Sequence, residues 1–344
     1  MDILNNSYRN RGPFPGLDDI PWPVSDPSTA QARIARCPRA SVTPLVDARA
    51  LADQAGVGHL WIKDERGRMG LGSFKALGAA HVIARDHDAG QAAGQTYVTA
   101  SAGNHGMSVA AGAAAFKARA VIYIAETVPE VFAERLRATG AEVVREGATY
   151  EDSMAAALRA SDEQGWALLS DSSWPGYVDR PLGVMEGYLI LMAEAVQQVP
   201  EPPTHIFLQA GVGGLAAACA AHARRVWGDA PRIIVVEPDA APALFASIRA
   251  GKAVHAPGPV SVMGRLDCKD PSLIALKGLA RDADDFVLIS EEDAQSGSQT
   301  LSDAGWPSTP SGAAGVAAAL LAGNTLGLTP TSRILCILSE SPEA

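Results

Sequence analysis

A single lysine, Lys75, lies in the stretch LGSFKALGAA, residues 71–80, which holds no other charged residue. An ordinary surface lysine would lay its stem along the protein and keep its ammonium in water. An amine in an apolar setting instead has a lowered pKa and can attack an aldehyde as a Schiff-base nucleophile. The residues after Lys75 are typical of a helix, whose positive end would lower the pKa further. The sequence therefore predicts a reactive amine, with the surface lysine as the alternative.

A second candidate is the glycine-rich stretch QAGVGGLAAA, residues 209–218, between an apolar run and an alanine-rich helix. Backbone N–H groups in such a loop, together with the helix N-terminus, bind a phosphate. Gly211, Gly213 and Ala216 also match the dinucleotide pattern G-x-G-x-x-A. Glu237 then stands where a ribose-binding acid is expected. A nicotinamide-dependent oxidoreductase is therefore one alternative, and a plain strand–helix turn is another.

The third candidate is TASAGNHGMSVA, residues 99–110, which also leads from a strand-like run into a helix. Ser101, Gly103 and Asn104 supply a hydroxyl, an uncrowded backbone and an amide, which suits a bound carboxylate. Helix capping by Ser101 or Asn104 is the alternative. Ala110 replaces the last glycine of the G-x-S-x-G pattern, and His105 has no matching Ser–Asp pair, so a hydrolase triad is not predicted.

Together these stretches offer an amine, a phosphate site and a carboxylate site. The dinucleotide interpretation explains one of the three. A cofactor that carries both an aldehyde and a phosphate explains all of them, and pyridoxal phosphate is such a cofactor.

The elements that must position these residues follow an alternating pattern. Helix-like stretches separate short runs of aliphatic and β-branched residues, which indicates an α/β fold with parallel sheets. Residues 1–30 are rich in Pro, Asn and Asp and are expected to form an irregular arm. The expected strands are residues 59–62, 96–99, 120–125, 141–144, 167–170, 205–210, 232–237, 286–290 and 333–339.

Composition narrows the function classes. The chain has 344 residues, of which 47% are hydrophobic, and a net charge of −10 without a basic run, so nucleic-acid or anionic-membrane binding is not expected. We see no secretory signal, and Lys117 and Arg119 interrupt the most apolar stretch, so no membrane span is expected. The cysteines are far apart and predict free thiols, a cytoplasmic location and no metal site; they are Cys37, Cys219, Cys268 and Cys336.

From about residue 40 onward, an ordered series of motifs resembles the fold-type II pyridoxal-phosphate enzymes, which share the tryptophan synthase β-like fold. Within them the chain is most similar to the diaminopropionate ammonia-lyase and threonine dehydratase family. The motifs are TPLV (43–46), IKDERGRMGLGSFKALG (62–78), AGNHG (102–106), SDSSWPGY (170–177), VMEGY (184–188), QAGVGG (209–214), VVEP (235–238), SVMGRLDCKDPS (261–272) and PSGAAG (310–315).

The resemblance implies a role for each matching residue. Lys75 would bind the cofactor covalently and act as the base at the substrate's α-carbon, and Asp171 would bind the β-amino group or take the α-proton. Asn104 would contact the cofactor's 3′-oxygen, and Ser339 would lie beside the pyridine nitrogen. The phosphate would be held by the backbone of Gly211, Val212, Gly213, Gly214 and Leu215. The substrate carboxylate would be held by Ser101, Ala102, Gly103, Asn104 and His105.

The resemblance also implies an arm (1–39), a large cofactor-binding domain (40–75 plus 191–344) and a small inserted domain (76–190), with the cofactor in the cleft between two parallel-sheet domains. The expected activity is α,β-elimination from a small L-amino acid with a β-amino or β-hydroxyl group, giving a 2-oxo acid and ammonia. The alternative on the same scaffold is a β-replacement synthase. A homodimer is implied as well.

Two departures from the family patterns bear on the substrate. The diaminopropionate lyases carry an aspartate, linked to use of the D-isomer, where this chain has Ala102, so we expect L-substrates to be preferred. Threonine dehydratases carry Glu-Pro where this chain has Thr309-Pro310. The identity of the leaving group therefore stays open, and residues 292–309 match neither family.

Overall fold

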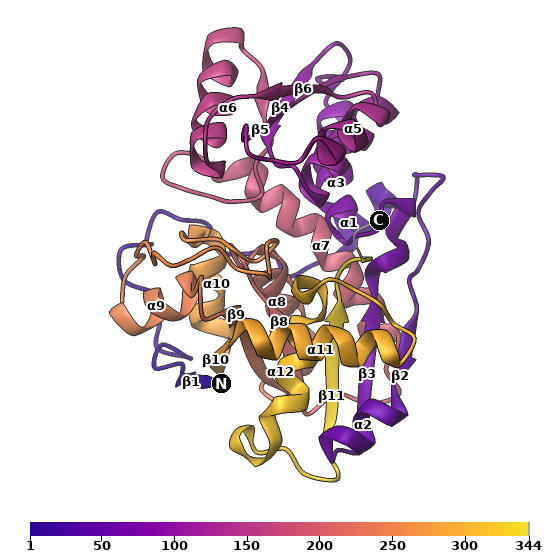
Figure 1. The fold of residues 1–344 in the computed structure, drawn as a ribbon, viewed down its shortest axis with the longest axis vertical. Coiled ribbons are helices and arrows are strands. Elements are labelled where there is room, and N and C mark those ends of the chain that lie inside the picture. The colour runs from indigo at the N-terminus through magenta and orange to yellow at the C-terminus, as the bar shows by residue number, and fades with distance from the viewer. Residues whose placement is uncertain (343–344) are drawn as a thin grey trace.

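The computed structural model describes residues 1–342, which form two sheets with helices packed around them (Figure 1). The larger sheet has the order β1-β10-β9-β8-β11-β3-β2. Its five inner strands are parallel, and β1 and β2 are antiparallel edges. The strands are β1 (Asp2–Asn5), β2 (Leu45–Asp47), β3 (His59–Asp64), β8 (His205–Gln209), β9 (Arg232–Pro238), β10 (Asp285–Ile289) and β11 (Arg333–Leu338).

The smaller sheet has four parallel strands in the order β6-β5-β4-β7. In its centre, Val98 lies opposite Val121 on one side and Leu168 on the other. Every run that the sequence predicts as a strand forms one, because apolar runs of this length suit parallel strands buried on both faces. The strands are β4 (Thr96–Ala100), β5 (Arg119–Ile124), β6 (Glu142–Arg145) and β7 (Ala167–Leu168).

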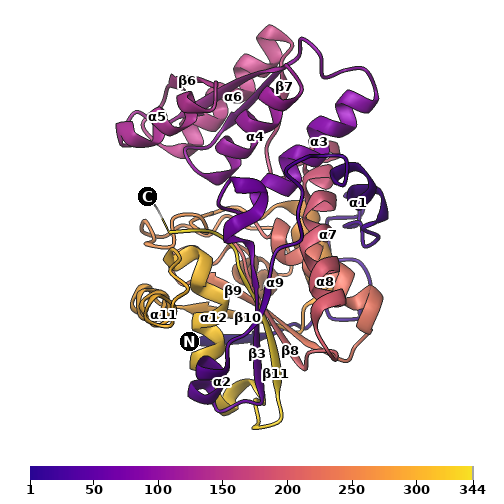
Figure 2. The same cartoon turned by 90° about the vertical axis from the view of Figure 1, so that its right-hand side faces the viewer.

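Helices cover both faces of the larger sheet, with α2, α11 and α12 on one face and α7 and α8 on the other (Figure 2). Alternation along β8 separates the two cores, since Phe207 packs on the first face and Ile206 and Leu208 on the second. The helices are α1 (Ser28–Ile34), α2 (Arg49–Ala55), α3 (Lys75–Asp88), α4 (Asn104–Ala115), α5 (Glu130–Ala138), α6 (Tyr150–Gln164), α7 (Asp179–Gln198), α8 (Gly214–Trp227), α9 (Ala243–Ala250), α10 (Leu273–Asp282), α11 (Glu291–Asp303) and α12 (Pro310–Ala322), with 3₁₀ turns η1 (Glu65–Gly70) and η2 (Gly323–Leu326).

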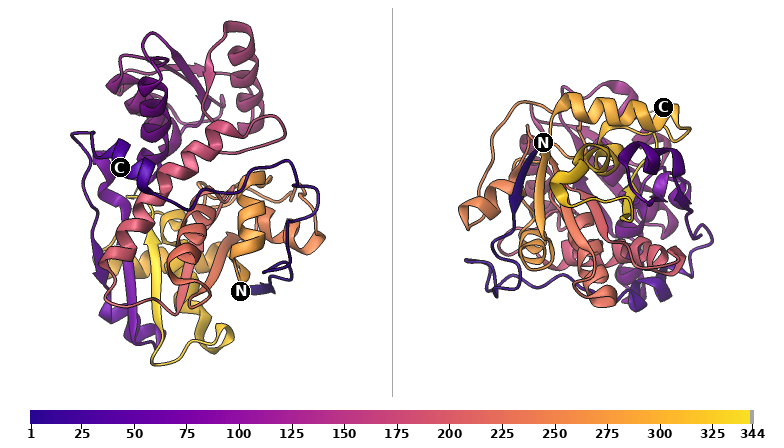
Figure 3. Two further views of the ribbon diagram at one scale, coloured as in Figure 1. Left: turned by 180° about the vertical axis from the view of Figure 1, so that it is seen from behind. Right: turned by 90° about the horizontal axis from the view of Figure 1, so that it is seen from below.

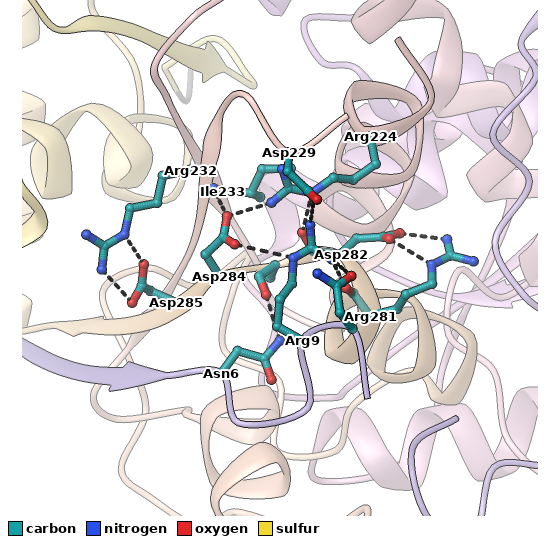
Figure 4. Close-up of polar contacts among 12 residues, drawn as sticks. Asn6, Arg9, Arg224, Asp229, Arg232, Ile233, Arg281, Asp282, Asp284 and Asp285 are labelled. Carbon is teal, nitrogen blue, oxygen red and sulfur yellow. Dashed lines mark hydrogen bonds and ion pairs between the residues drawn. The ribbon is translucent and has the colours of Figure 1, made fainter. Parts of the chain in front are cut away.

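The N-terminal segment is more ordered than the expected irregular arm. Its first residues form β1, which pairs with β10 at the sheet edge, with Ile3 opposite Val287 (Figure 3). A cluster of charged side chains anchors the residues after β1 (Figure 4). The Arg9 guanidinium donates to the Asp284 carboxylate at 3.3 Å and to the Arg281 carbonyl at 2.9 Å. Asp284 in turn accepts from the backbone N–H of Ile233 at 2.7 Å. These contacts with distant parts of the chain, together with the buried side chains of Phe14, Leu17 and Ile20, order the segment.

The expected domain bounds stay a prediction, although strands β4 to β7 form one sheet and the other strands form the second. Helix α7 crosses residue 190 without a break and extends from the smaller part of the molecule along the larger sheet (Figure 1). No sharp boundary therefore falls at that residue.

Close packing between α3 and α7 fixes the helix that begins at Lys75. A Cβ atom on Gly187 would lie 2.5 Å from the carbonyl oxygen of Leu77. A Cβ atom on Gly78 would lie 2.7 Å from the Tyr188 ring and from a Val184 methyl group. The two backbones therefore approach so closely that only glycine fits, and this contact sets the position of Lys75.

We predict that Gly187→Ala lowers the free energy of unfolding by about 1–3 kcal/mol, because a methyl group in a filled interface forces the helices apart. Gly67→Ala is the matched control, since a Cβ there meets nothing within 4 Å. Urea unfolding of the two variants checks this, and equal losses would contradict the packing described.

Candidate active site

A cavity of about 350 Å³ lies at the carboxyl ends of strands from both sheets. Loops that follow β4, β7, β8 and β11 line it, as does the start of α3. In open parallel sheets, ligands bind at this edge. The structure brings together on this cavity every site residue that the sequence predicts, namely Lys75, Ser101, Ala102, Gly103, Asn104, His105, Asp171, Gly211, Val212, Gly213, Gly214, Leu215 and Ser339.

Lys75 is the first residue of α3, and its ammonium forms an ion pair with the carboxylate of Asp171. The two side chains are 21% and 17% exposed, so the pair opens onto the cavity without being fully solvated. The Lys75 nitrogen lies 5.3 Å from the centre of the Phe74 ring and 5.8 Å from that of Tyr188. The amine is therefore held between two aromatic rings and one carboxylate.

The prediction of a lowered pKa for Lys75 is wrong for this arrangement. Burial does disfavour the ammonium, but the adjacent Asp171 carboxylate outweighs it and raises the pKa of Lys75 above its ordinary value of 10.5. Burial likewise works against ionised Asp171, yet the Lys75 charge holds the pKa of that carboxyl below its usual range. In this structure the side chain of Lys75 is therefore an ammonium, because the effect of the Asp171 carboxylate exceeds that of burial.

The glycine loop between β8 and α8 presents backbone to the cavity. Gly213 precedes α8 and has a φ of +97°, and a Cβ there would lie 3.0 Å from side-chain atoms of Leu244 and Ala275. The first hydrogen bond of α8 runs from Ala217 N to Gly213 O at 2.9 Å. The N–H groups before Ala217 therefore have no acceptor inside the helix, as a phosphate site requires.

Glu237, the expected ribose-binding acid of the nicotinamide alternative, has another role. Its two carboxylate oxygens accept from the backbone N–H groups of Leu244 and Phe245, at 2.8 and 2.7 Å. Burial raises the pKa of Glu237 to about 8 despite these two bonds. The carboxyl caps the start of α9 and is fully buried, so it is not available to a ribose.

The start of α4 is where the sequence predicts a carboxylate site, and its residues line the cavity. Gly103 precedes the helix, and its N–H donates to the Ser101 hydroxyl at 3.3 Å. His105 is buried, and its Nε2 donates to the carbonyl of Leu169 at 2.8 Å. Burial lowers the pKa of His105, so the ring is neutral and its Nδ1 is an acceptor without a partner among the described residues. An unsatisfied buried acceptor is costly, which is typical of a site that receives a ligand.

Sequence reasoning missed a carboxylate beside Asn104. The Asn104 amide donates to Glu340 Oε2 at 2.5 Å, and the hydroxyl of Thr309 donates to Glu340 Oε1. Glu340 is 3% exposed and lines the cavity next to the predicted Ser339. The position of Glu340 directly after β11 could have indicated that it lies at the site. Residues that follow parallel strands lie at the same edge of the sheet.

Among the other cavity residues that were not predicted are Tyr150, Arg265 and Cys268. Arg265 and Cys268 lie in the motif SVMGRLDCKDPS, but the sequence indicated no role for either residue. Tyr150 lines the cavity although it is 51% exposed, and its hydroxyl can donate a hydrogen bond there.

Among residues 1–342, no cluster of metal-ligating side chains of three or more was found, and no helix has the length and hydropathy to cross a membrane.

The comparisons with known proteins agree with this geometry. Residues 38–340 match the family model "Pyridoxal-phosphate dependent enzyme", so the chain belongs to that family. The nicotinamide interpretation of the glycine loop is therefore wrong.

Among its relatives, the diaminopropionate ammonia-lyase of Escherichia coli K12 is 31% identical over 328 residues, which are 88% of this chain and 80% of the relative. A crystal structure of the Escherichia coli diaminopropionate ammonia-lyase with an aminoacrylate–PLP azomethine intermediate superposes with a TM-score of 0.89 at 28% identity, covering 99% of this chain and 93% of the other. Its complex with D-serine also has a TM-score of 0.89, with 27% identity and the same coverage.

The cavity residues fit pyridoxal phosphate. The loop from Gly211 to Leu215 offers backbone N–H groups for the phosphate, and Lys75 offers the amine for the aldehyde. Asn104 and Ser339 supply polar groups for the ring. All four groups already line one cavity.

We predict that Asp171→Asn in the cofactor-free protein moves the acetylation of Lys75 to lower pH by about 1–3 pH units, because the carboxylate no longer favours the ammonium. Acetylation as a function of pH, read by peptide mass spectrometry, measures this. The exposed carboxylate Asp270, which pairs with His255, provides the control Asp270→Asn. The Lys75–Asp171 pair stabilises the fold fully between pH 3.8 and pH 10.5, the ordinary pKa values of its two members. This contribution disappears as pH rises through the raised pKa of Lys75 and as pH falls through the lowered pKa of Asp171. An unchanged labelling profile in Asp171→Asn would contradict the assignment.

Proposed function

We propose that this chain is a pyridoxal-phosphate-dependent lyase that eliminates a β-amino or β-hydroxyl group from a small L-amino acid, giving a 2-oxo acid and ammonia. The observation that carries the proposal is the Lys75–Asp171 pair in a cavity that also holds the glycine loop and the start of α4. The diaminopropionate ammonia-lyase relative, which aligns with 88% of the chain, supports this reaction class.

Each part of the cavity has a task in this proposal. Lys75 holds the cofactor's aldehyde, and the N–H groups from Gly211 to Leu215 hold its phosphate. Ser101 and the backbone N–H groups at the start of α4 bind the substrate carboxylate, where the helix dipole favours an anion. Asn104, oriented by Glu340, and Ser339 contact the cofactor ring.

Pyridoxal phosphate, when bound, withdraws electrons from the substrate's α-carbon and so makes its proton acidic. Lys75 would be a free amine once the substrate's amino group has replaced it on the cofactor, and it would then take that proton. Asp171, which contacts this amine, would stabilise the ammonium that results. The Cα–H bond and the bond from Cβ to its leaving group break, and a Cα=Cβ bond forms. Asp171 would also bind a β-ammonium group of the substrate. The same carboxylate would then contact both the base, Lys75, and the leaving group.

We expect 2-oxo acid to appear when the holoenzyme receives L-2,3-diaminopropionate, L-threonine, L-serine or 3-hydroxyaspartate. Lys75→Ala should lower kcat by at least about 10³-fold, because it removes the base and the cofactor's anchor. Asp171→Asn should keep bound cofactor, seen as the visible absorption band, while kcat falls by about 10²–10⁴-fold. Full activity in Lys75→Ala would refute the mechanism.

The β-replacement alternative shares the first half of this reaction and is separated by the same assay with a competing thiol. A thioether product formed in place of the 2-oxo acid would assign the chain to the synthases. Elimination predicts that the thiol leaves the yield of 2-oxo acid unchanged.

Ala102 supports a preference for L-substrates, since it lines the cavity next to Gly103 and has no group that could hold a proton. The resembling lyases carry an aspartate at this position. We predict that Ala102→Asp raises the D-serine to L-serine ratio of kcat/KM by on the order of tenfold or more, as a base on the second face would. Ala102→Asn is the control of equal size without a base. An equal gain in Ala102→Asn would contradict this role.

The homodimer and the domain bounds remain proposals that rest on the family resemblance, and the cytoplasmic location remains a proposal that rests on the spacing of the cysteines. Analytical ultracentrifugation of the purified holoenzyme tests the oligomeric state, and a monomer at micromolar concentration would contradict it.

A further inference from the structure

We infer that two buried serines, Ser173 and Ser272, position Asp171 against the amine of Lys75 by joining the loop after β7 to the start of α10. They are called the serine pair below. Neither serine is among the residues that line the cavity, so both are positioning residues. The inference deepens the proposed elimination and rests on it for the effect on turnover, although not for the effect on the Lys75 amine.

Hydrogen bonds connect every polar atom of Ser173 to the start of α10. Its backbone N–H donates to the Ser272 hydroxyl at 3.2 Å, and the two hydroxyls bond to each other at 2.8 Å. The Ser173 hydroxyl also accepts from the N–H of Ile274 at 2.9 Å, and the Ser173 carbonyl accepts from the N–H of Leu273 at 3.1 Å. Ser173 is 2% exposed and Ser272 is fully buried, so water does not compete for these bonds.

The serine pair exchanges the usual roles of a helix cap. Ser272 is the N-cap of α10, where a serine ordinarily accepts from an N–H in the first turn of its own helix. Ser272 makes no such bond, and the hydroxyl of Ser173 accepts from Ile274 in its place. Capping alone does not require this exchange, because the N-cap serine could do it. The exchange instead joins two segments that are 99 residues apart in the chain.

The same two segments contact the glycine loop that is assigned to the phosphate. The backbone N–H of Ser272 donates to the carbonyl of Val212 at 3.0 Å. A Cβ atom on Gly214 would lie 3.9 Å from the carbonyl oxygen of Asp171. Ser272 therefore binds the glycine loop through its backbone and the Asp171 loop through its side chain, which fixes Asp171 relative to the phosphate site.

The other end of the Asp171 loop is anchored to the smaller part of the molecule. The carbonyl of Leu169 accepts from Nε2 of His105 at 2.8 Å. Asp171 thus lies between this anchor and Ser173. Without the Ser272 hydroxyl, the buried N–H of Ser173 would have no acceptor, which is costly, and the loop would shift to find another. Such a shift moves the carboxylate of Asp171 away from Lys75.

The first test measures acetylation of Lys75 as a function of pH in the full-length chain without cofactor. Ser272→Ala keeps the backbone bond to Val212 and removes the acceptor of the Ser173 N–H. We expect the profile to move to lower pH by about 0.5–1 pH unit, because the carboxylate of Asp171 then stabilises the ammonium less. In the Asp171→Asn background, Ser272→Ala should cause no further shift, since it acts through that carboxylate.

Ser247→Ala is the matched control. Ser247 is fully buried, and its hydroxyl donates to the carbonyl of Ala243 at 2.7 Å and accepts from the N–H of Val254 at 3.1 Å. The control therefore loses the same kinds of hydrogen bond away from the cavity and should leave the labelling of Lys75 unchanged. Equal shifts in Ser247→Ala and Ser272→Ala would overturn the inference, as would a further shift in the Asp171→Asn background.

The second test separates turnover from cofactor binding in the holoenzyme. Ser272→Ala should keep the visible absorption band of the bound cofactor, because the backbone of the glycine loop is unchanged. Its kcat for the amino acid that the wild type turns over should fall by about 10- to 100-fold, as expected when a catalytic group is misplaced by about 1 Å. Loss of the absorption band together with kcat would show a general structural role and would overturn the inference. Ser173→Ala removes the other hydroxyl of the serine pair and should behave alike, so the test stands if one variant does not fold.

The two proposals fail separately. If the wild type turns over no amino acid but Ser272→Ala still moves the labelling of Lys75, the elimination is wrong and the role of the serine pair stands. If the wild type is active and Ser272→Ala changes neither the labelling nor kcat, the role of the serine pair is wrong and the elimination stands.

Discussion

The site depends on one ion pair that joins the two sheets. Lys75 follows β3 of the larger sheet by way of η1, and Asp171 follows β7 of the smaller sheet. Their contact requires the carboxyl ends of both sheets to face one cavity. It also sets the charge of the amine, because Asp171 overcomes the effect of burial and keeps Lys75 protonated. The position of the Lys75 nitrogen and its charge thus have the same origin.

Close helix packing holds that geometry in place. Gly187 and Gly78 bring the backbones of α3 and α7 together, and α7 continues along the larger sheet. A buried charge cluster supports the approach to Lys75 from the other side. Arg68 of η1 binds Glu65 and Glu194, and Lys63 of β3 binds Glu194 at 2.7 Å. Glu194 lies on α7, so the helix that packs on α3 also holds the turn before it. Replacing one member would leave a buried charge unpaired, which is costly.

The burial of the parallel strands explains which elements the sequence could predict. Buried parallel strands have long apolar runs, so every inner strand was found, and the loops after them carried the expected site residues. The edge strands β1 and β2 were missed because they are short and are stabilised by pairing with distant residues. Helix α11 was not assigned, although Ser290 and Asp293 form a capping box at its start. It lies in a stretch that matches neither family.

The contacts between site side chains were harder to predict from the sequence than the strands and loops. The expected fall in the pKa of Lys75 considered its neighbours in sequence, whereas the deciding charge is 96 residues away. Glu340 was missed for the same reason, since it contacts Asn104 from a distant part of the chain. The sequence correctly predicted that the glycine loop lies between a strand and a helix. The spacing of its glycines, however, also fits a dinucleotide-binding loop. The burial of Glu237 and the family match resolve that ambiguity.

The central claim is that Lys75 is the residue that holds the cofactor. Reduction of the holoenzyme with borohydride makes the bond between an amine and the cofactor's aldehyde permanent, and peptide mass spectrometry then locates it. We expect a phosphopyridoxyl group on the peptide that contains Lys75 and on no other. Modification of a different lysine, or a protein that binds pyridoxal phosphate without any covalent label, would contradict it.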